Sequence, residues 1–126
     1  MLKIKRVYEA PGPRDGERIL VDGLWPRGLS KRTAAVDRWM RELAPSPALR
    51  AWFGHDPARW AEFRRRYQAE LRAHRVALAA LARTARTRSV TLLFGSRDTA
   101  HNNAVVLKRA IEREMRRRGG PRRRAA

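Results

Sequence analysis

The sequence predicts an α/β fold, a single layered domain with a small, mostly parallel sheet flanked by helices. Apolar segments of strand length alternate along the chain with segments of helical period, which is typical of layered α/β domains. Expected strands with continuous apolar centres indicate burial on both faces of a sheet. The chain has 126 residues, of which 43% are hydrophobic, and this size suits one domain with its own core.

Two strands are expected in the first part of the chain. Residues 2–10 ("LKIKRVYEA") alternate with a period of two, which predicts the first strand. The turn-forming residues of "PGPRDGE" (11–17) predict a loop. The segment "RILVD" (18–22) has a continuous apolar centre and predicts a second, buried strand.

The next stretch combines a loop with an amphipathic segment. Pro26 and Gly28 interrupt any regular period in residues 23–31, which predicts an irregular loop. Apolar residues then recur at helical spacing, at Val36, Trp39, Met40 and Leu43. This spacing favours a short amphipathic helix over residues 33–43, although a strand through Val36 fits the same residues.

Two helices with clear start signals follow. Ser46 is the expected N-cap of the first, Pro47 suits its first position and Gly54 ends it. Asp56 is the expected N-cap of the second, which is again followed by proline. The core face of this second helix is formed by Trp60, Phe63, Tyr67 and Leu71.

The C-terminal part supplies two more helices and a third strand. Residues 76–86 predict a helix, residues 90–94 a buried strand, and residues 100–118 the last helix. The core stripe of that last helix is Ala104, Leu107, Ile111 and Met115. We assign residues 1–115 to the α/β domain and expect residues 116–126 to be a disordered, arginine-rich tail.

The composition excludes several classes of protein. Cysteine is absent, which excludes disulfides, thiolate catalysis and thiolate metal ligands. The chain begins without an apolar stretch of signal-peptide length, and no apolar run approaches the ~20 residues that span a bilayer. We therefore expect a soluble, cytoplasmic protein that does not enter a membrane.

The net charge of +18 favours binding to polyanions. Removing residues 116–126 takes away six arginines and no acids and leaves +12, so the excess is not confined to the tail. The basic residues are 26 arginines and four lysines. This bias also fits a G+C-rich genome that places arginine on solvated surfaces, in which case the charge has no function of its own.

The junction after the third strand, in "VTLLFGSRDTAHNNAVVL" (90–107), is the first candidate site. Helix N-termini favour anions, and Arg97 adds a guanidinium suited to phosphate or carboxylate. On a helical wheel His101 and Asn103 face the edge of the sheet, whereas Asn102 faces solvent or caps a neighbouring loop. A structural interpretation is also open, in which Asp98 or Thr99 is only an N-cap and His101 only packs.

A second polar cluster follows the second strand, in "LVDGLWPRG" (20–28). If this strand is a parallel neighbour of the third, Asp22, Trp25 and Arg27 reach the same crevice as the junction. His55, in "WFGHDPARW" (52–60), is a further candidate. Together these residues predict a pocket for a small anionic or nucleotide-like ligand. Asp22 is otherwise a loop cap, and Trp25 part of the core.

Three long strings resemble the YeaO-like branch of the bacterial family named domain of unknown function 488. They are "RVYEAPGPRDGERILVDGLWPRG", "ELAPSPALRAWFGHDPARWAEFRRRY" and "VTLLFGSRDTAHNNAVVL", and the resemblance covers roughly residues 3–115. It implies an α/β domain of small cytoplasmic proteins and implies no reaction. The matching residues are Asp22, Leu24, Trp25, Pro26, Arg27, Gly28, Trp52, Phe53, His55, Asp56, Pro57, Asp98, Thr99, His101 and Asn102.

The chain departs from the family pattern at two positions, and it lacks a motif that another branch carries. The family usually has arginine at the position of Gly23 and commonly histidine at the position of Asn103. Another branch carries a cysteine-rich form of the final motif, which this chain lacks. The resemblance therefore implies no redox or metal role for these positions here.

The sequence supports a binding site more strongly than a named reaction. His55, His74 and His101 lack ligand spacing, so we expect no metal site, and no cofactor motif such as a P-loop is present. The leading hypothesis is a protein that binds a small anionic or nucleotide-like ligand, with or without turnover. The alternatives are a low-specificity nucleic-acid-associated protein that uses its basic surface and tail, and a module that docks an acidic protein.

Overall fold

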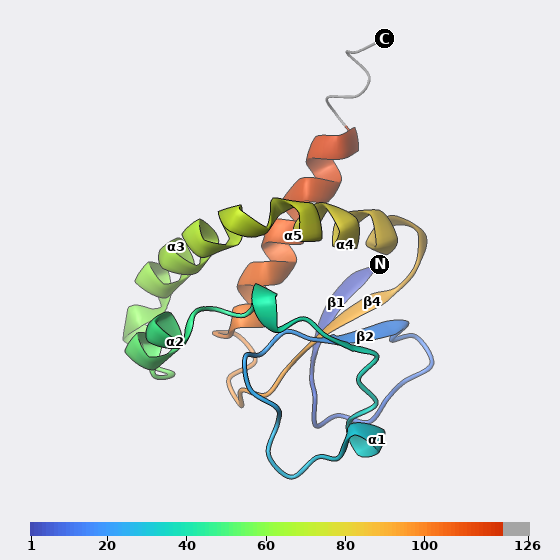
Figure 1. Ribbon diagram of the computed structural model, residues 1–126, viewed down its shortest axis with the longest axis horizontal. Coiled ribbons are helices and arrows are strands. Elements are labelled where there is room, and N and C mark those ends of the chain that lie inside the picture. Colours follow the sequence, from blue (N-terminus) through green and yellow to red (C-terminus); the bar gives the residue numbers. More distant parts are fainter. Residues whose placement is uncertain (120–126) are drawn as a thin grey trace.

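Among the described residues the sheet has four strands in the order β1-β4-β2-β3, and each neighbouring pair is parallel. Figure 1 shows β1, β4 and β2 side by side. The structure, a computed structural model, describes residues 1–119. Its strands are β1 (Leu2–Arg6), β2 (Glu17–Leu20), β3 (Arg38–Trp39) and β4 (Val90–Phe94). The predicted α/β fold with a mostly parallel sheet is confirmed. Because β4 lies between β1 and β2, all of its side chains are buried, which accounts for its continuous apolar sequence.

One face of the sheet is covered by the larger helices. They are α2 (Pro47–Phe53), α3 (Trp60–Leu71), α4 (Arg75–Thr87) and α5 (Asn103–Gly119), with the 3-10 turns η1 (Arg41–Leu43), η2 (Pro57–Arg59) and η3 (Arg72–His74). Figure 1 shows α3, α4 and α5 on one side of the strands and the short helix α1 (Lys31–Ala34) on the other. The main core lies between these helices and alternate strand residues, such as Ile19 and Leu92. No described helix is long and apolar enough to cross a membrane.

The other face of the sheet is covered by α1 and the loops beside it. Leu20 and Leu93 form a second, smaller core there with Ala34, and Trp25 and Trp39 pack against it. Both faces of the sheet are therefore covered by helices or loops.

The local start and stop signals of α2 are confirmed. The Ser46 side chain accepts a hydrogen bond from the N–H of Leu49, Pro47 occupies the first turn, and Gly54 ends the helix in a left-handed conformation. The same chemistry begins η2, where the Asp56 side chain accepts from the N–H of Ala58.

The predicted helix over residues 33–43 is wrong. Helix α1 ends earlier, at Ala34, and the chain then forms β3 and η1, so the strand alternative is closer to the structure. The apolar residues at helical spacing belong to two different cores. Val36 and Trp39 pack on the second face, whereas Met40 and Leu43 lie in the main core. The spacing thus arises from a chain that passes from one face of the sheet to the other.

Several predicted ends also differ from the structure. Strand β1 stops at Arg6 and not at residue 10, because its only neighbour, β4, ends at Phe94 opposite Arg6. Helix α5 begins at Asn103 and not at residue 100. It runs to Gly119, one residue beyond the predicted helix end at residue 118, so residues 116–119, which the domain assignment placed in the tail, belong to the helix. The rest of the predicted tail (120–126) lies outside the described residues.

Candidate functional site

The two polar clusters predicted from the sequence meet at the carboxyl edge of the sheet. Strands β2 and β4 are parallel neighbours, so the residues that follow them emerge side by side. The carboxylate of Asp22 accepts a hydrogen bond from the backbone N–H of Gly95, with 2.8 Å between Oδ2 and N. A Cβ atom at Gly95 would lie only 3.1 Å from the same oxygen, so this close approach favours glycine.

The backbone around Asp22 is held on two sides. The indole Nε1 of Trp39 donates to the carbonyl oxygen of Asp22 at 2.8 Å. On the other side, the amide Nδ2 of Asn103 donates to the carbonyl of Val21 at 2.9 Å. Since β3 supplies Trp39 and α5 supplies Asn103, both elements fix the position of the Asp22 carboxylate.

The environment of Asp22 opposes its ionisation. Burial raises the pKa of Asp22 above its ordinary value. The Gly95 N–H and the Asn103 amide offset part of this rise, as does the positive charge of Arg50. The carboxyl group therefore takes up a proton more readily than an exposed aspartate does.

A turn centred on Asp98 joins β4 to α5. One carboxylate oxygen of Asp98 accepts from the N–H groups of Ala100 and His101, both at 2.9 Å, and the other lies 3.0 Å from Nδ1 of His101. The N–H of His101, then that of Ala100, hold the pKa of the Asp98 carboxyl below its ordinary value. Asp98 thus fixes the ring of His101, which also packs edge-on against Trp60.

The N-cap of α5 is Asn102. Its Oδ1 accepts from the N–H of Val105 at 3.2 Å, and its Nδ2 donates to the carbonyl of Asp98 at 2.9 Å. The side chain is buried, so the expectation that it faces solvent is wrong, whereas its bond to the Asp98 carbonyl agrees with the alternative that it caps a neighbouring loop. The helical wheel assumed a helix that begins at residue 100. Because α5 begins at Asn103, Asn102 lies before the helix and not on one of its faces.

A pocket of about 390 Å³, which we name the edge pocket, opens beside these groups. Seven of the nine predicted site residues line it: Asp22, Trp25, Arg27, His55, His101, Asn102 and Asn103. The other two, Arg97 and Asp98, do not line it. Arg97 is exposed. Asp98 acts on the pocket through the ring of His101.

Much of the pocket wall is aromatic. The indole of Trp25 donates to the carbonyl of Leu29 at 2.7 Å and packs edge-on against Trp39. Phe53 and Phe63 are stacked, with ring centroids 4.3 Å apart, and both line the pocket. Such a wall suits the face of a flat organic ring.

The backbone of His55 adopts a strained conformation. Its φ of 58° lies in the left-handed region, which residues other than glycine rarely adopt. It directly follows Gly54, which has a φ of 52°. These two residues turn the chain after α2, and the His55 side chain lines the edge pocket. Left-handed residues of this kind often occur at binding sites.

Sequence reasoning missed Arg50, a basic residue of the pocket. Arg50 lies in the last turn of α2, one helical turn before the buried Phe53, and lines the edge pocket. Its spacing from Phe53 was the only signal in the sequence, because no strand end or loop motif marks it. Within residues 1–119, the side chains of Arg50 and Arg27 make no hydrogen bond or ion pair.

The pocket is better equipped for binding than for covalent chemistry. His101 is oriented by Asp98, as a general base would be. The hydroxyl that lines the pocket, Ser96 Oγ, accepts from the N–H of Asp98 at 3.1 Å and so belongs to the turn. The described residues hold no group of three or more acidic or histidine side chains arranged for a metal ion.

Comparison with known proteins agrees with the family that the shared strings predict. A family model described as the inactive DUF488-N3 subclade matches residues 1–126. The uncharacterized protein YeaO of Escherichia coli is 42% identical over 106 residues, which cover 84% of this chain and 92% of YeaO. The uncharacterized protein Rv3073c of Mycobacterium tuberculosis is 40% identical over 110 residues, which cover 87% of this chain and 92% of Rv3073c. No solved structure matches the chain.

Proposed function

We propose that this chain, which belongs to the inactive DUF488-N3 subclade, binds a small organic anion in the edge pocket without converting it. The observation that carries the proposal is the pair of guanidinium groups at the pocket, Arg27 and Arg50, which make no hydrogen bond or ion pair among residues 1–119. Guanidinium groups bind phosphate and carboxylate through paired hydrogen bonds. The description of the subclade as inactive favours binding over turnover.

The remaining wall of the pocket supports an organic ring attached to the anion. Trp25, Phe53 and Phe63 supply apolar surface, and the fixed ring of His101 supplies a nitrogen that donates or accepts. A volume of about 390 Å³ is within the usual range for small-molecule sites. A nucleoside monophosphate or an aromatic carboxylate has this combination of ring and charge.

A thermal-shift screen of the full chain tests the proposal. The probes are inorganic phosphate, sulfate, nucleoside monophosphates and aromatic carboxylates. A bound probe at ~100 times its dissociation constant stabilises the fold by about 2.7 kcal/mol, which raises the melting temperature by several degrees. We expect Arg50→Ala and His101→Ala to abolish this rise, and chromatography to recover the probe unchanged.

Arg97→Ala is the matched control. Arg97 is exposed and does not line the edge pocket, so its removal lowers the net charge by one without touching the site. We expect this variant to keep the full shift. The proposal fails if no probe stabilises the wild type, or if Arg97→Ala loses as much of the shift as Arg50→Ala.

A second candidate function, association with nucleic acid, has one observation in its favour. A groove of about 420 Å³ runs between the α3–α4 junction and α5, on the helical layer. Among the described residues, four arginines and one acid line it: Arg72, Arg75, Arg113, Arg117 and Glu114. Glu114 lies within 4 Å of Arg75 and Arg117, which leaves Arg72 and Arg113 to meet a polyanion.

A further inference from the structure

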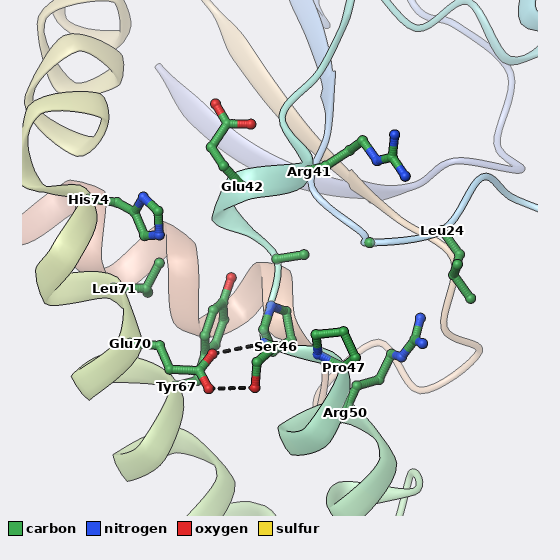
Figure 2. Close-up of a pocket in the computed structure, with 13 residues that line it drawn as sticks. Leu24, Arg41, Glu42, Ser46, Pro47, Arg50, Tyr67, Glu70, Leu71 and His74 are labelled. Carbon is green, nitrogen blue, oxygen red and sulfur yellow. Dashed lines mark hydrogen bonds between the residues drawn. The ribbon is translucent and has the colours of Figure 1, made fainter.

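A second cleft, which we name the outer cleft, adjoins the edge pocket. Its volume is about 680 Å³, and it lies between η1, the start of α2 and the end of α3 (Figure 2). Four residues line both cavities: Gly23, Leu24, Pro45 and Arg50. Because they share these residues, the two cavities meet along one wall.

Gly23 leaves this shared wall thin. Its φ is not among the positive values, so its backbone conformation suits any residue. A Cβ atom built at Gly23 has one neighbour within 4 Å, the Cβ of Ala44 at 3.7 Å, which is an ordinary contact. Neither the backbone nor the packing requires glycine here. At Gly23 the shared wall therefore consists of backbone without a side chain.

The polar groups deep in the outer cleft already have partners. The carboxylate of Glu70 accepts from both the N–H and the hydroxyl of Ser46, at 2.8 and 2.6 Å (Figure 2). The buried hydroxyl of Tyr67 donates to the carbonyl of Leu43. These bonds join α3 to the start of α2 and to η1. They hold Ser46, Tyr67 and Glu70 in place along the wall of the outer cleft.

Two arginines supply the charge that is left for a ligand. Figure 2 shows Arg41 and Arg50 extending toward the side of the cleft where Leu24 lies. The guanidinium of Arg41 lies over the ring of Trp39, 4.4 Å from its centroid, and Trp39 also holds the backbone of Asp22. Trp39 therefore contacts a residue of the outer cleft, Arg41, and also holds a residue of the edge pocket, Asp22.

We infer that the edge pocket and the outer cleft form one two-chamber site for an organic phosphate in which a phosphoryl or pyrophosphoryl group joins two organic lobes. The joining group contacts Arg50 at the shared wall. The ring of one lobe packs on Trp25 and Phe53, and the second lobe passes Gly23 into the outer cleft beside Arg41. Glu42 and His74, which also line the outer cleft, suit a lobe rich in hydroxyl groups. This inference rests on the proposed function of the edge pocket.

The test compares a one-lobed with a two-lobed phosphate on the full chain. The probes are uridine monophosphate and uridine diphosphate glucose, with dissociation constants measured by calorimetry. We expect the two-lobed probe to bind the wild type at least about tenfold more tightly, which is about 1.4 kcal/mol. Gly23→Leu fills the passage and removes this gain, so that the two probes bind this variant with affinities within about twofold of each other.

Two arginine variants complete the test. Arg41→Ala is expected to lower only the affinity for the two-lobed probe, whereas Arg50→Ala lowers both affinities. Arg32→Ala is the matched control, because Arg32 is exposed and lines neither cavity. Far-ultraviolet circular dichroism and the melting temperature confirm that each variant is folded.

The possible failures separate the two proposals. Equal binding of both probes to the wild type overturns the two-chamber site and leaves the edge pocket as the proposed binding site. A gain that survives in both Gly23→Leu and Arg41→Ala overturns it as well, since the second lobe then lies elsewhere. If neither these probes nor the thermal-shift panel bind, both proposals are wrong.

Discussion

Two aspartates of this chain lie in environments with opposite effects on their charge. Asp15 is 3% exposed and lies on the second face of the sheet, where it pairs with Arg18 at 2.7 Å and Lys5 at 3.0 Å. Burial alone would raise the pKa of Asp15, but hydrogen bonds from Gly12, Lys5 and Arg18 together hold it well below its usual range. Asp22 has no such ion pair, and burial prevails there.

Asp15→Asn is expected to destabilise the fold strongly at neutral pH. Arg18 is also 3% exposed, so the substitution leaves a buried guanidinium without its carboxylate, which costs about 3–5 kcal/mol. A lowered pKa in the folded state means that the charge stabilises above pH 3.8, the unfolded value, and that this stability is lost as the pH falls through the folded value. Urea unfolding at pH 7 and below pH 3.8 measures the effect. A variant as stable as the wild type at pH 7 would contradict the prediction.

Asp22→Asn is expected to act in the opposite direction. The folded pKa is raised, so the contribution of Asp22 is full below pH 3.8 and is lost as the pH rises through the folded value. An asparagine oxygen still accepts from the Gly95 N–H and carries no charge to desolvate. We expect the variant to be at least as stable as the wild type at pH 7, with a weaker loss of stability between pH 4 and pH 7. Melting curves of the wild type and the variant at pH 4 and pH 7 test this expectation. A variant that is destabilised equally at both pH values would contradict the expected dependence of stability on pH.

At the scale of elements, the sequence correctly predicted those segments whose local residue pattern matches their place in the fold. The apolar run of β4 coincides with a central strand, and the Ser46, Pro47 and Gly54 signals coincide with the ends of α2. The meeting of Asp22 with the junction after β4 was predictable for the same reason. Parallel neighbouring strands bring their carboxyl ends together.

The remaining features depend on tertiary contacts that no local pattern encodes. The apolar residues at helical spacing in residues 33–43 belong to two cores on opposite faces of the sheet. Val36 packs against the smaller core, and Met40 lies in the main core. The place of Arg50 in the edge pocket depends on how α2 packs against α3. Arg97 was predicted as a site residue from its position in the junction, but in the structure it is exposed and does not line the edge pocket.

Asn102→Ala is expected to destabilise α5 and the junction before it. The substitution removes the acceptor of the Val105 N–H and the donor to the Asp98 carbonyl, and loss of an N-cap costs about 1–2 kcal/mol. Because the Asp98 turn holds His101, the loss also loosens one wall of the edge pocket. Chemical denaturation measures the stability, and hydrogen exchange of the first turn of α5 locates the effect.

Thr99→Ala is the control for that experiment. Thr99 was an alternative N-cap in the sequence, but in the structure it is exposed and its hydroxyl makes no hydrogen bond within residues 1–119. We expect its removal to change the free energy of unfolding by less than about 0.5 kcal/mol. If Thr99→Ala costs as much as Asn102→Ala, the cap of α5 has been misassigned.

At the scale of the whole molecule, the positive charge is the property that the edge pocket does not explain. Arg27 and Arg50 are two of 26 arginines, so most of the net charge of +18 lies elsewhere. Among the described residues, none lines both the edge pocket and the arginine groove between the α3–α4 junction and α5. Small-anion binding and polyanion binding therefore depend on different residues, and variants separate them.

Binding to duplex DNA is expected to be non-specific and to weaken steeply with salt. A surface that meets about six phosphates loses roughly 10³-fold in affinity between 50 and 200 mM salt, because counterions are released on binding. Ending the chain after Gly119 keeps all of α5 and removes three arginines, which leaves a net charge of +15. This truncation and the pair Arg72→Ala and Arg113→Ala are each expected to lower the salt slope. Neither change is expected to alter the thermal shift caused by a small anion.

Arg50→Ala provides the reciprocal comparison. It removes one positive charge at the edge pocket, so we expect loss of the small-anion shift and a decrease in DNA affinity no larger than that of the exposed control Arg32→Ala. Fluorescence anisotropy with a labelled duplex at several salt concentrations measures the slopes. DNA binding that persists at 200 mM salt in the truncated chain, yet disappears with Arg50→Ala, would place nucleic acid in the edge pocket. In that case the charge of the whole molecule would guide a polyanion to the same residues that hold the small ligand.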